Sequence, residues 1–245
     1  MLSLNLNQLH KPDNRSAFLD IYRGTAVLLM IVFHFCWDLR HFGYLDYSLT
    51  SPFWVGFRAV IVFLFLSAIG WSSYLAVQSG QPFSRFRKHM AVLLLAATSI
   101  SLVTYIIFPK QWIFFGILHF IFLASIAVRP MARTPFISLA LAVAIAAMYW
   151  LTDWFAFTDF KHVLYNDLNL PRKTVDIIAP IPWICAVFIG PIFGYLKIHT
   201  FRLPSNLITA GIAVMGRYAL RVYLTHQIIL FSLVATAHYL ITKLT

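Results

Sequence analysis

Long apolar runs, divided by short polar connections, are the feature that most constrains how this chain can fold. An α-helix needs about 20 apolar residues to cross the hydrocarbon layer of a bilayer, and each run is close to that length. The sequence therefore predicts an all-α, polytopic transmembrane helix bundle with about seven spans. We expect the spans over residues 18–39, 54–78, 89–108, 111–129, 135–151, 177–197 and 217–241.

The composition agrees with a membrane protein. Of the 245 residues, 60% are hydrophobic and 11% are charged, whereas about a quarter of the residues of a soluble domain are charged. The formal net charge of +11 is carried mostly by the connections between the apolar runs, where Lys and Arg fix the orientation of membrane helices. We therefore expect the lipid bilayer as a partner, and no nucleic acid.

The basic residues favour one set of alternate connections. That set holds Lys11, Arg15, Arg85, Arg87, Lys88, Arg129, Arg133, Lys197 and Arg202. The other set has fewer basic residues, and acidic residues offset those of the 152–176 connection. Basic connections lie in the cytoplasm, which predicts a cytoplasmic N-terminal segment (1–17), a single transmembrane domain (18–245) and an external C-terminus. The segment 198–216 is predicted as a loop, a re-entrant segment or an interfacial helix.

The first apolar run carries a polar stripe made of Asp20, Arg23, His34 and Asp38. Residues of an α-helix follow one another at about 100°, so the step from Arg23 to His34 ends about 20° beyond three full turns. Asp38 lies about 40° further on, and Asp20 lies within about 60° of Arg23. The four residues therefore share one face, along which Arg23 and His34 are about 16 Å apart.

A charged side chain at the centre of a span costs at least about 2.5–3.5 kcal/mol, so it normally faces a cavity or a partner. Asp20 and Arg23 can be explained as boundary residues that reach the lipid headgroups. His34 lies too deep for that explanation. Arg58, near the outer end of the second span, is a candidate partner for Asp38.

Two further histidines are predicted near mid-depth: His119 in the fourth span and His226, followed by Gln227, in the last. They either converge on His34 or make separate interhelical hydrogen bonds. Arg217 and Arg221 stand at the cytoplasmic start of the last span. They are either topology signals or, together with Arg23, the binding site of an anionic ligand.

These residue types suggest group transfer. A histidine in a cavity of low dielectric can act as a general base toward an alcohol or an amine, and Asp38 lies one turn away, where it can orient the His34 ring. Arginine clusters bind phosphates. We therefore expect a phosphate-bearing cytosolic donor, although spacing alone does not identify the transferred group.

The segment LDIYRGTAVLLMIVFHF, with ten residues between Arg23 and His34, resembles the opening helix of membrane acyltransferases, including the acyltransferase-3 family. The wider start, RSAFLDIYRGTAVLLMIVFHFCWDL, resembles the bacterial members of the heparan-alpha-glucosaminide N-acetyltransferase catalytic-domain family. Three later segments, FLFLSAIGWSSYLA, WIFFGILHFI and GRYALRVYLTHQIIL, resemble that family's second, histidine-bearing and closing helices in the same order.

The resemblance implies a membrane-embedded acyltransferase of the bacterial cytoplasmic (inner) membrane. It would move an acyl group, typically acetyl, from cytosolic acyl-CoA to a glycan or glycolipid acceptor at or beyond the membrane, with no metal. The acceptor would be recognised by short loops such as 152–176. The candidate catalytic residues are His34, Asp38, His119 and His226. The candidate residues for binding acyl-CoA are Arg23, Arg217 and Arg221.

Two other classes of protein use similar residues. A proton-coupled transporter also carries intramembrane Asp, His and Arg residues, but it is expected to show inverted repeats, and none is visible in the sequence. A haem-binding membrane subunit would use mid-span histidines as axial ligands. The sequence is compatible with a homo-oligomer but does not fix the oligomeric state.

Overall fold

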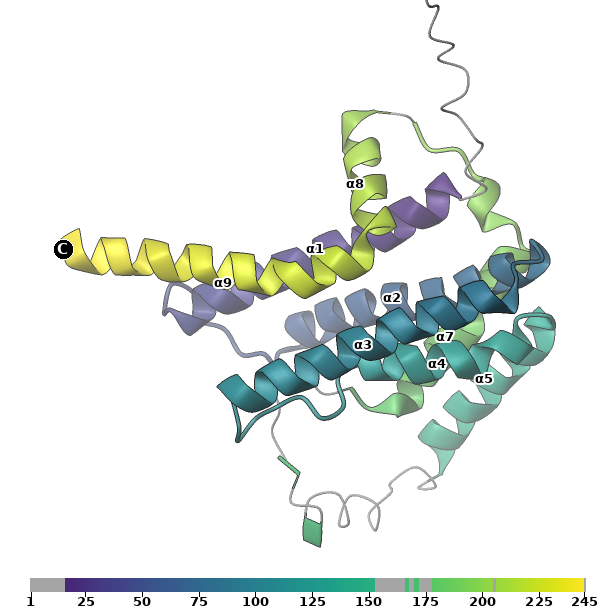
Figure 1. Ribbon diagram of the computed structural model, residues 1–245, viewed down its shortest axis with the longest axis horizontal. Coiled ribbons are helices and arrows are strands. Elements are labelled where there is room, and N and C mark those ends of the chain that lie inside the picture. The colour runs from purple at the N-terminus through teal and green to yellow at the C-terminus, as the bar shows by residue number, and fades with distance from the viewer. Residues whose placement is uncertain (1–15, 153–165, 168–169, 172–177, 205, 245) are drawn as a thin grey trace, which may run out of the picture.

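The computed structural model describes residues 16–152, 166–167, 170–171, 178–204 and 206–244, and in these ranges it contains helices and no strands (Figure 1). The all-α prediction is therefore confirmed. The helices are α1 (Ala17–His41), α2 (Pro52–Gln78), α3 (Phe83–Ile107), α4 (Ile117–Met131), α5 (Pro135–Leu151), α7 (Pro180–Tyr195), η3 (Ile198–Thr200), α8 (Leu207–Arg217) and α9 (Ala219–Leu244).

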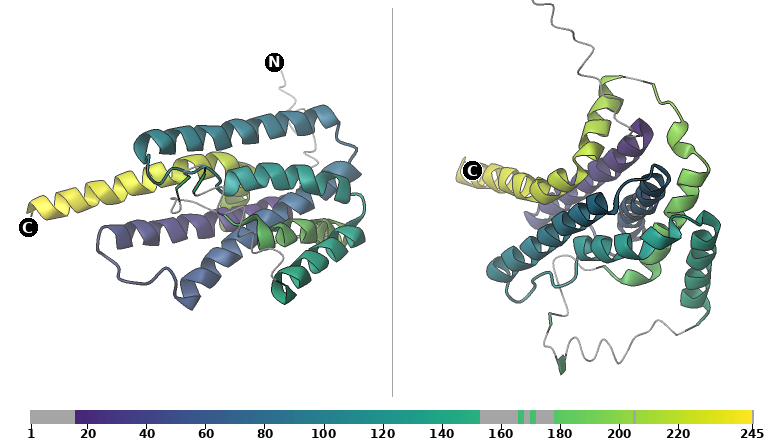
Figure 2. Two further views of the ribbon diagram at one scale, coloured as in Figure 1. Left: turned by 90° about the horizontal axis from the view of Figure 1, so that it is seen from below. Right: turned by 45° about the vertical axis from the view of Figure 1, so that its right-hand side comes forward.

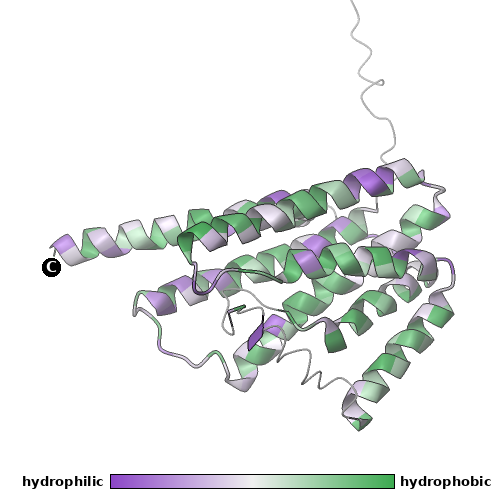
Figure 3. Cartoon of the chain, turned by 60° about the horizontal axis from the view of Figure 1, so that its bottom comes forward, coloured by the Kyte–Doolittle hydropathy of each residue, from purple (hydrophilic) through white to green (hydrophobic). Residues whose placement is uncertain are grey.

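Four of these helices, α1, α2, α3 and α9, are long and apolar enough to cross a membrane, and α4, α5, α7 and α8 are shorter apolar helices. Apolar colouring dominates along the helices (Figure 3), and large side chains such as Leu95 and Ile106, each 69% exposed, face outward. Lipid, rather than water, suits such a surface. The number of spans and their orientation remain predictions.

One predicted span differs clearly from the structure. The span expected over 111–129 begins at Ile117, because residues 108–116 form an irregular connection between Phe108 and the N-cap Gly116. Pro109, at the start of this connection, cannot donate a backbone hydrogen bond to continue α3. His119 therefore lies in the first turn of α4, and the prediction that it sits at mid-helix was wrong.

The α2–α7 interface is the apolar centre of the bundle. Its core includes Leu66 from α2 and Val187 from α7, both fully buried, with Phe120 and Val128 from α4 packed against them. A Cβ added to Gly70 would overlap the carbonyl oxygen of Val187. The two helices therefore approach at the distance that small residues permit in membrane proteins.

A second interface joins the two ends of the chain. Helix α9 lies beside α1 and runs in the same direction, past the end of α1 (Figures 1 and 2). Val27 and Met30 of α1 pack against residues of α8 and of the first turn of α9. Helix α8 crosses the first half of α1 (Figure 1), where Gly216 leaves room for the backbone of Asp20.

Among the alternatives for 198–216, the structure shows the short turn η3 and helix α8. Helix α8 begins at a capping box, in which the Asn206 side chain accepts a hydrogen bond from the backbone N–H of Thr209. Only Tyr218 separates α8 from α9. The packing of this short helix on α1 thus brings the start of α9 to the polar stripe.

Candidate active site

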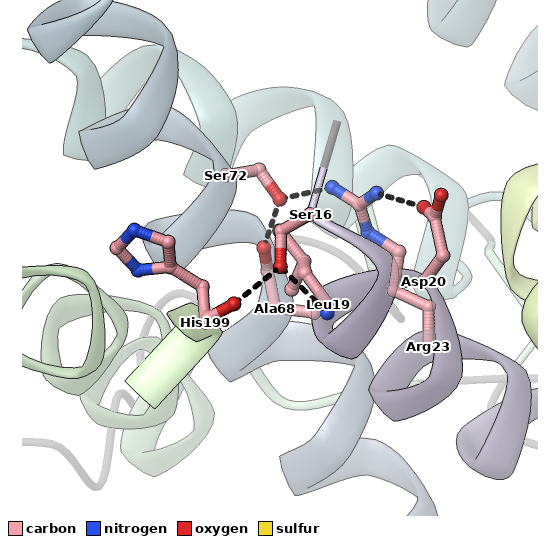
Figure 4. Close-up of polar contacts among 7 residues, drawn as sticks. All are labelled: Ser16, Leu19, Asp20, Arg23, Ala68, Ser72 and His199. Carbon is pink, nitrogen blue, oxygen red and sulfur yellow. Dashed lines mark hydrogen bonds and ion pairs between the residues drawn. The ribbon is translucent and has the colours of Figure 1, made fainter. Parts of the chain in front are cut away.

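Arg23 is held at the N-terminal end of α1, between α1 and α2. Its Nη1 lies 3.4 Å from Oδ1 of Asp20, and its Nη2 donates to Ser72 Oγ, which itself donates to the carbonyl oxygen of Ala68 (Figure 4). The Arg23 side chain remains 25% exposed. The guanidinium group is therefore oriented by two elements and still reaches the surface.

The same end of α1 is anchored to the turn before α8. Ser16 Oγ accepts a hydrogen bond from the backbone N–H of Leu19, which caps α1. The same hydroxyl donates to the carbonyl oxygen of His199, 3.1 Å away (Figure 4). This contact fixes the start of the helix that carries the polar stripe.

His34 and His226 meet at the α1–α9 interface. Their ring centroids are 4.8 Å apart and the rings are nearly perpendicular, at 79°. His34 Nδ1 lies 2.9 Å from the carbonyl oxygen of Met30, and His226 Nδ1 lies 2.7 Å from that of Tyr223. A carbonyl only accepts, so each Nδ1 carries a proton, and each neutral ring keeps its lone pair on Nε2.

Asp38 lies beside this pair and is fully buried. Its Oδ1 accepts a hydrogen bond of 2.8 Å from Nε2 of Gln227. The expected partnership with Arg58 was wrong, since Arg58 is exposed and Gln227 takes its place. The His34 ring is oriented by the Met30 carbonyl rather than by Asp38.

Three buried atoms in this cluster lack a hydrogen-bond partner: Asp38 Oδ2, Gln227 Oε1 and His226 Nε2. All three are acceptors, because Gln227 donates through its other atom and the Nδ1 of His226 carries the proton. Burial of an unsatisfied acceptor costs about 1–3 kcal/mol. The cluster is therefore short of donors, and an amine, a hydroxyl or a water molecule would supply them.

His119 stands apart from the pair. Its Nδ1 accepts the backbone N–H of Gly116 at 3.2 Å, so Nε2 carries the proton of the neutral ring and faces Ser101 Oγ at 3.1 Å. Nδ1 thus caps the start of α4, and Nε2 joins α4 to α3. Of the two alternatives left open for His119 and His226, His226 converges on His34, and His119 makes a separate interhelical hydrogen bond.

Residues 15–228 match the family described as "Heparan-alpha-glucosaminide N-acetyltransferase, catalytic". The chain belongs to this family. The match confirms the resemblance found in the sequence, and it covers the stripe of α1, the three histidines, and Arg217 and Arg221 at the junction of α8 and α9. No curated protein and no solved structure matches the chain.

Membership in the heparan-alpha-glucosaminide N-acetyltransferase catalytic family makes the chain a member of an acyltransferase family, as expected. It gives the polar residues of α1 and α9 a chemical context. Arg217 closes α8 next to Gly216, which packs on the backbone of Asp20. Arg221 follows on α9, with its guanidinium 5.2 Å from the centroid of the Tyr218 ring. Both are exposed near the end of α1 that holds Arg23.

Sequence reasoning missed two residues of this candidate site. Ser72 orients Arg23, and Gln227 satisfies one oxygen of Asp38. A signal existed for Gln227, because it directly follows His226 and precedes the apolar run IILF. The predicted acceptor loop, 152–176, lies almost entirely outside the described residues, as does most of the N-terminal segment 1–17.

Proposed function

We propose that this protein transfers an acyl group, normally acetyl, from cytosolic acyl-CoA to a sugar or glycoconjugate acceptor at or beyond the membrane. The observation that carries the proposal is the histidine pair. His34 and His226 lie ring to ring at the α1–α9 interface, and each keeps an Nε2 lone pair. The family membership supports acetyl transfer to an amino sugar.

In the proposed reaction, His34 Nε2 takes the proton of the acceptor amine or hydroxyl. The acceptor's lone pair forms a bond to the thioester carbonyl carbon, and the carbon–sulfur bond breaks. Protonated His34 then returns the proton to the departing sulfur, so that the thiol form of CoA leaves. A positioned general base of this kind contributes about 10²–10⁴-fold to the rate.

The buried acceptors around Asp38 support a place for the acceptor substrate. An amine or hydroxyl bound beside His226 would donate to atoms that otherwise lack partners. Asp38 also adds negative charge near an imidazolium that forms at His34, and this charge favours the proton-transfer step. In this proposal Asp38 positions and stabilises the reacting groups, and His34 moves the proton.

The donor is proposed to lie along α1. Arg23 and His34 are about 16 Å apart along the helix axis, and CoA carries its phosphates at one end and its thioester at the other. Arg23, Arg217 and Arg221 supply positive charge at the end that we predict to be cytoplasmic. With the phosphates there, the thioester would reach the histidines.

The test is transfer of labelled acetyl from acetyl-CoA to a panel of amino sugars by the purified protein in nanodiscs. We expect His34→Ala to lower the rate about 100-fold or more. His238→Ala, near the far end of α9, serves as the matched control and should transfer normally. Normal transfer by folded His34→Ala would remove His34 from the mechanism. Solute flux in proteoliposomes without any acyl donor would instead favour a transporter.

A further inference from the structure

A cavity of about 630 Å³ lies where α2 ends, α3 begins and α4 ends. Its walls include Val77, Gly80, Gln81, Phe83, Arg129 and Arg133. Cavities that hold small molecules usually measure about 300–1,000 Å³. None of these residues belongs to the polar stripe or to the histidine pair, so the cavity is a separate feature of the molecule.

The cavity is positively charged and lacks compensating charge. Arg129 and Arg133 are one turn apart, close enough for the charge of one to act on the other, and like charges at this spacing repel. The chain contains no Asp or Glu from residue 47 to residue 152. Neither arginine forms an ion pair within the described part of the chain. Two repelling cations that line one cavity are stabilised by a bound anion.

The Arg129 head group is held in place rather than free in solvent. Its guanidinium carbon lies 4.8 Å from the centroid of the Phe86 ring on α3, a geometry that orients a planar cation. On the facing wall, Gly80 has φ of 65° and nothing within 4 Å of the site of a Cβ. The cavity is therefore open at this turn, and Gln81 adds an amide that can donate.

The cavity opens at the same end of the molecule as Arg23. The start of α1, the α2–α3 turn and the α4–α5 turn all lie at that end (Figures 1 and 2). Ser72, which binds Arg23, precedes Val77 by about 7.5 Å along α2. The charge of Arg23 also acts on His89 of α3, close to the other wall. The three arginines thus share one positive region.

We propose that Arg129 and Arg133 bind a phosphate group in this cavity. Arginine pairs recognise phosphate oxygens through paired, charge-assisted hydrogen bonds. Two sources carry this chemistry: the nucleotide of the acyl donor and the headgroup of an anionic phospholipid. Naming the donor as the source rests on the proposed function, whereas the phosphate site itself does not.

Arginines near helix ends also act as topology signals, which need only positive charge. A lysine keeps that charge but cannot make the paired hydrogen bonds of a guanidinium. The pair Arg129→Lys/Arg133→Lys therefore separates the two roles. The double variant Arg129→Gln/Arg133→Gln removes both the positive charge and the paired hydrogen bonds. The matched control is Arg58→Gln, because Arg58 is an exposed arginine at the other end of α2.

The experiment measures CoA binding by calorimetry to the full chain in phosphatidylcholine nanodiscs. The Gln pair should weaken CoA binding at least tenfold and the Lys pair should weaken it partially, with Arg58→Gln unchanged. A parallel arm measures phosphatidylglycerol retained by the purified protein in native mass spectrometry. Loss of CoA binding identifies the donor as the source, and loss of retained phosphatidylglycerol alone identifies the lipid. The site is overturned if folded Gln-pair protein keeps both ligands.

Failure of this site is distinguishable from failure of the proposed function. Arginine-dependent CoA binding without acetyl transfer to any acceptor would leave the site standing and reject the transferase. Acetyl transfer with an unchanged KM for acetyl-CoA in the Gln pair, and unchanged lipid retention, would leave the transferase standing and reject the site. Thermal unfolding of each variant shows which samples are folded.

Discussion

The α2–α7 and α1–α9 interfaces are built differently, and the helices of the first are more hydrophobic than those of the second. The first is apolar and close-packed, with Gly70 against the backbone of Val187 and fully buried Leu66 beside it. The second buries Asp38 and His226 and leaves three acceptor atoms without donors. Interhelical packing alone requires only the first kind of interface. The unsatisfied acceptors at the second interface support the proposal that it binds a substrate.

The largest expected effect breaks the close-packed interface. Gly70→Val would drive a side chain into the carbonyl of Val187 and into Pro191, and overpacking of this kind costs about 3 kcal/mol. Gly56→Val, in the same helix but with open space around it, should change stability by less than about 0.5 kcal/mol. Thermal stability followed by size-exclusion chromatography measures both variants. Equal stability of the two would show that α2 and α7 do not approach as described.

The next effect concerns activity at the polar interface. His226→Phe keeps a ring of similar size beside His34 but removes Nε2 and the hydrogen bond to the Tyr223 carbonyl. We expect the rate of acetyl transfer to fall about tenfold or more, which corresponds to about 1.4 kcal/mol, with stability nearly unchanged. An unaltered rate would mean that His34 works without its neighbour.

His119 tests whether polarity alone marks a catalytic interface. Both of its ring nitrogens are already hydrogen-bonded, to Gly116 and Ser101. We therefore expect His119 to stabilise the fold, as the residues of the α2–α7 interface do, and not to take part in catalysis. His119→Ala should destabilise the protein by about 1 kcal/mol, as the loss of a helix cap does, and leave transfer per folded molecule intact. Loss of transfer at normal stability would place His119 among the catalytic residues.

Asp38→Asn should separate stability from activity. The new amide group would replace one of the three unsatisfied acceptors, Asp38 Oδ2, with a donor beside the other two, and would remove a buried charge, so we expect a gain of about 1 kcal/mol. Transfer should fall, because the carboxylate no longer favours an imidazolium at His34. A variant that is less stable and fully active would contradict both parts. Asp46→Asn, in the exposed connection after α1, is the control.

The smallest effect lies outside both interfaces. Burial, and then the charge of Lys197, lower the pKa of His199, which sits in the turn that anchors α1. The unfolded chain therefore binds a proton more readily, and the contribution of His199 to stability falls as the pH drops through its ordinary pKa. The difference in melting temperature between pH 7.5 and pH 5.5 should be smaller in His199→Gln than in the unaltered protein. Equal differences would show that His199 does not contribute.

The sequence correctly predicted features that depend on a single helix, but not contacts between helices. Run length predicted the helices, and helical geometry alone predicted the shared face of Arg23 and His34. The partners Ser72 and Gln227 arrive from other helices, so no pattern within α1 could reveal them. His119 was misplaced because the connection before α4 is itself rich in apolar residues, and hydropathy does not distinguish such a connection from a helix.

The parallel course of α1 and α9 has a consequence for biosynthesis. The two histidines are separated by nearly the whole chain, yet they face each other in the folded protein. During synthesis the first helix enters the membrane long before its partner exists. The histidine pair is therefore assembled only when α9 inserts, and a ribosome-bound or C-terminally truncated chain carries His34 without the neighbour that completes the pair.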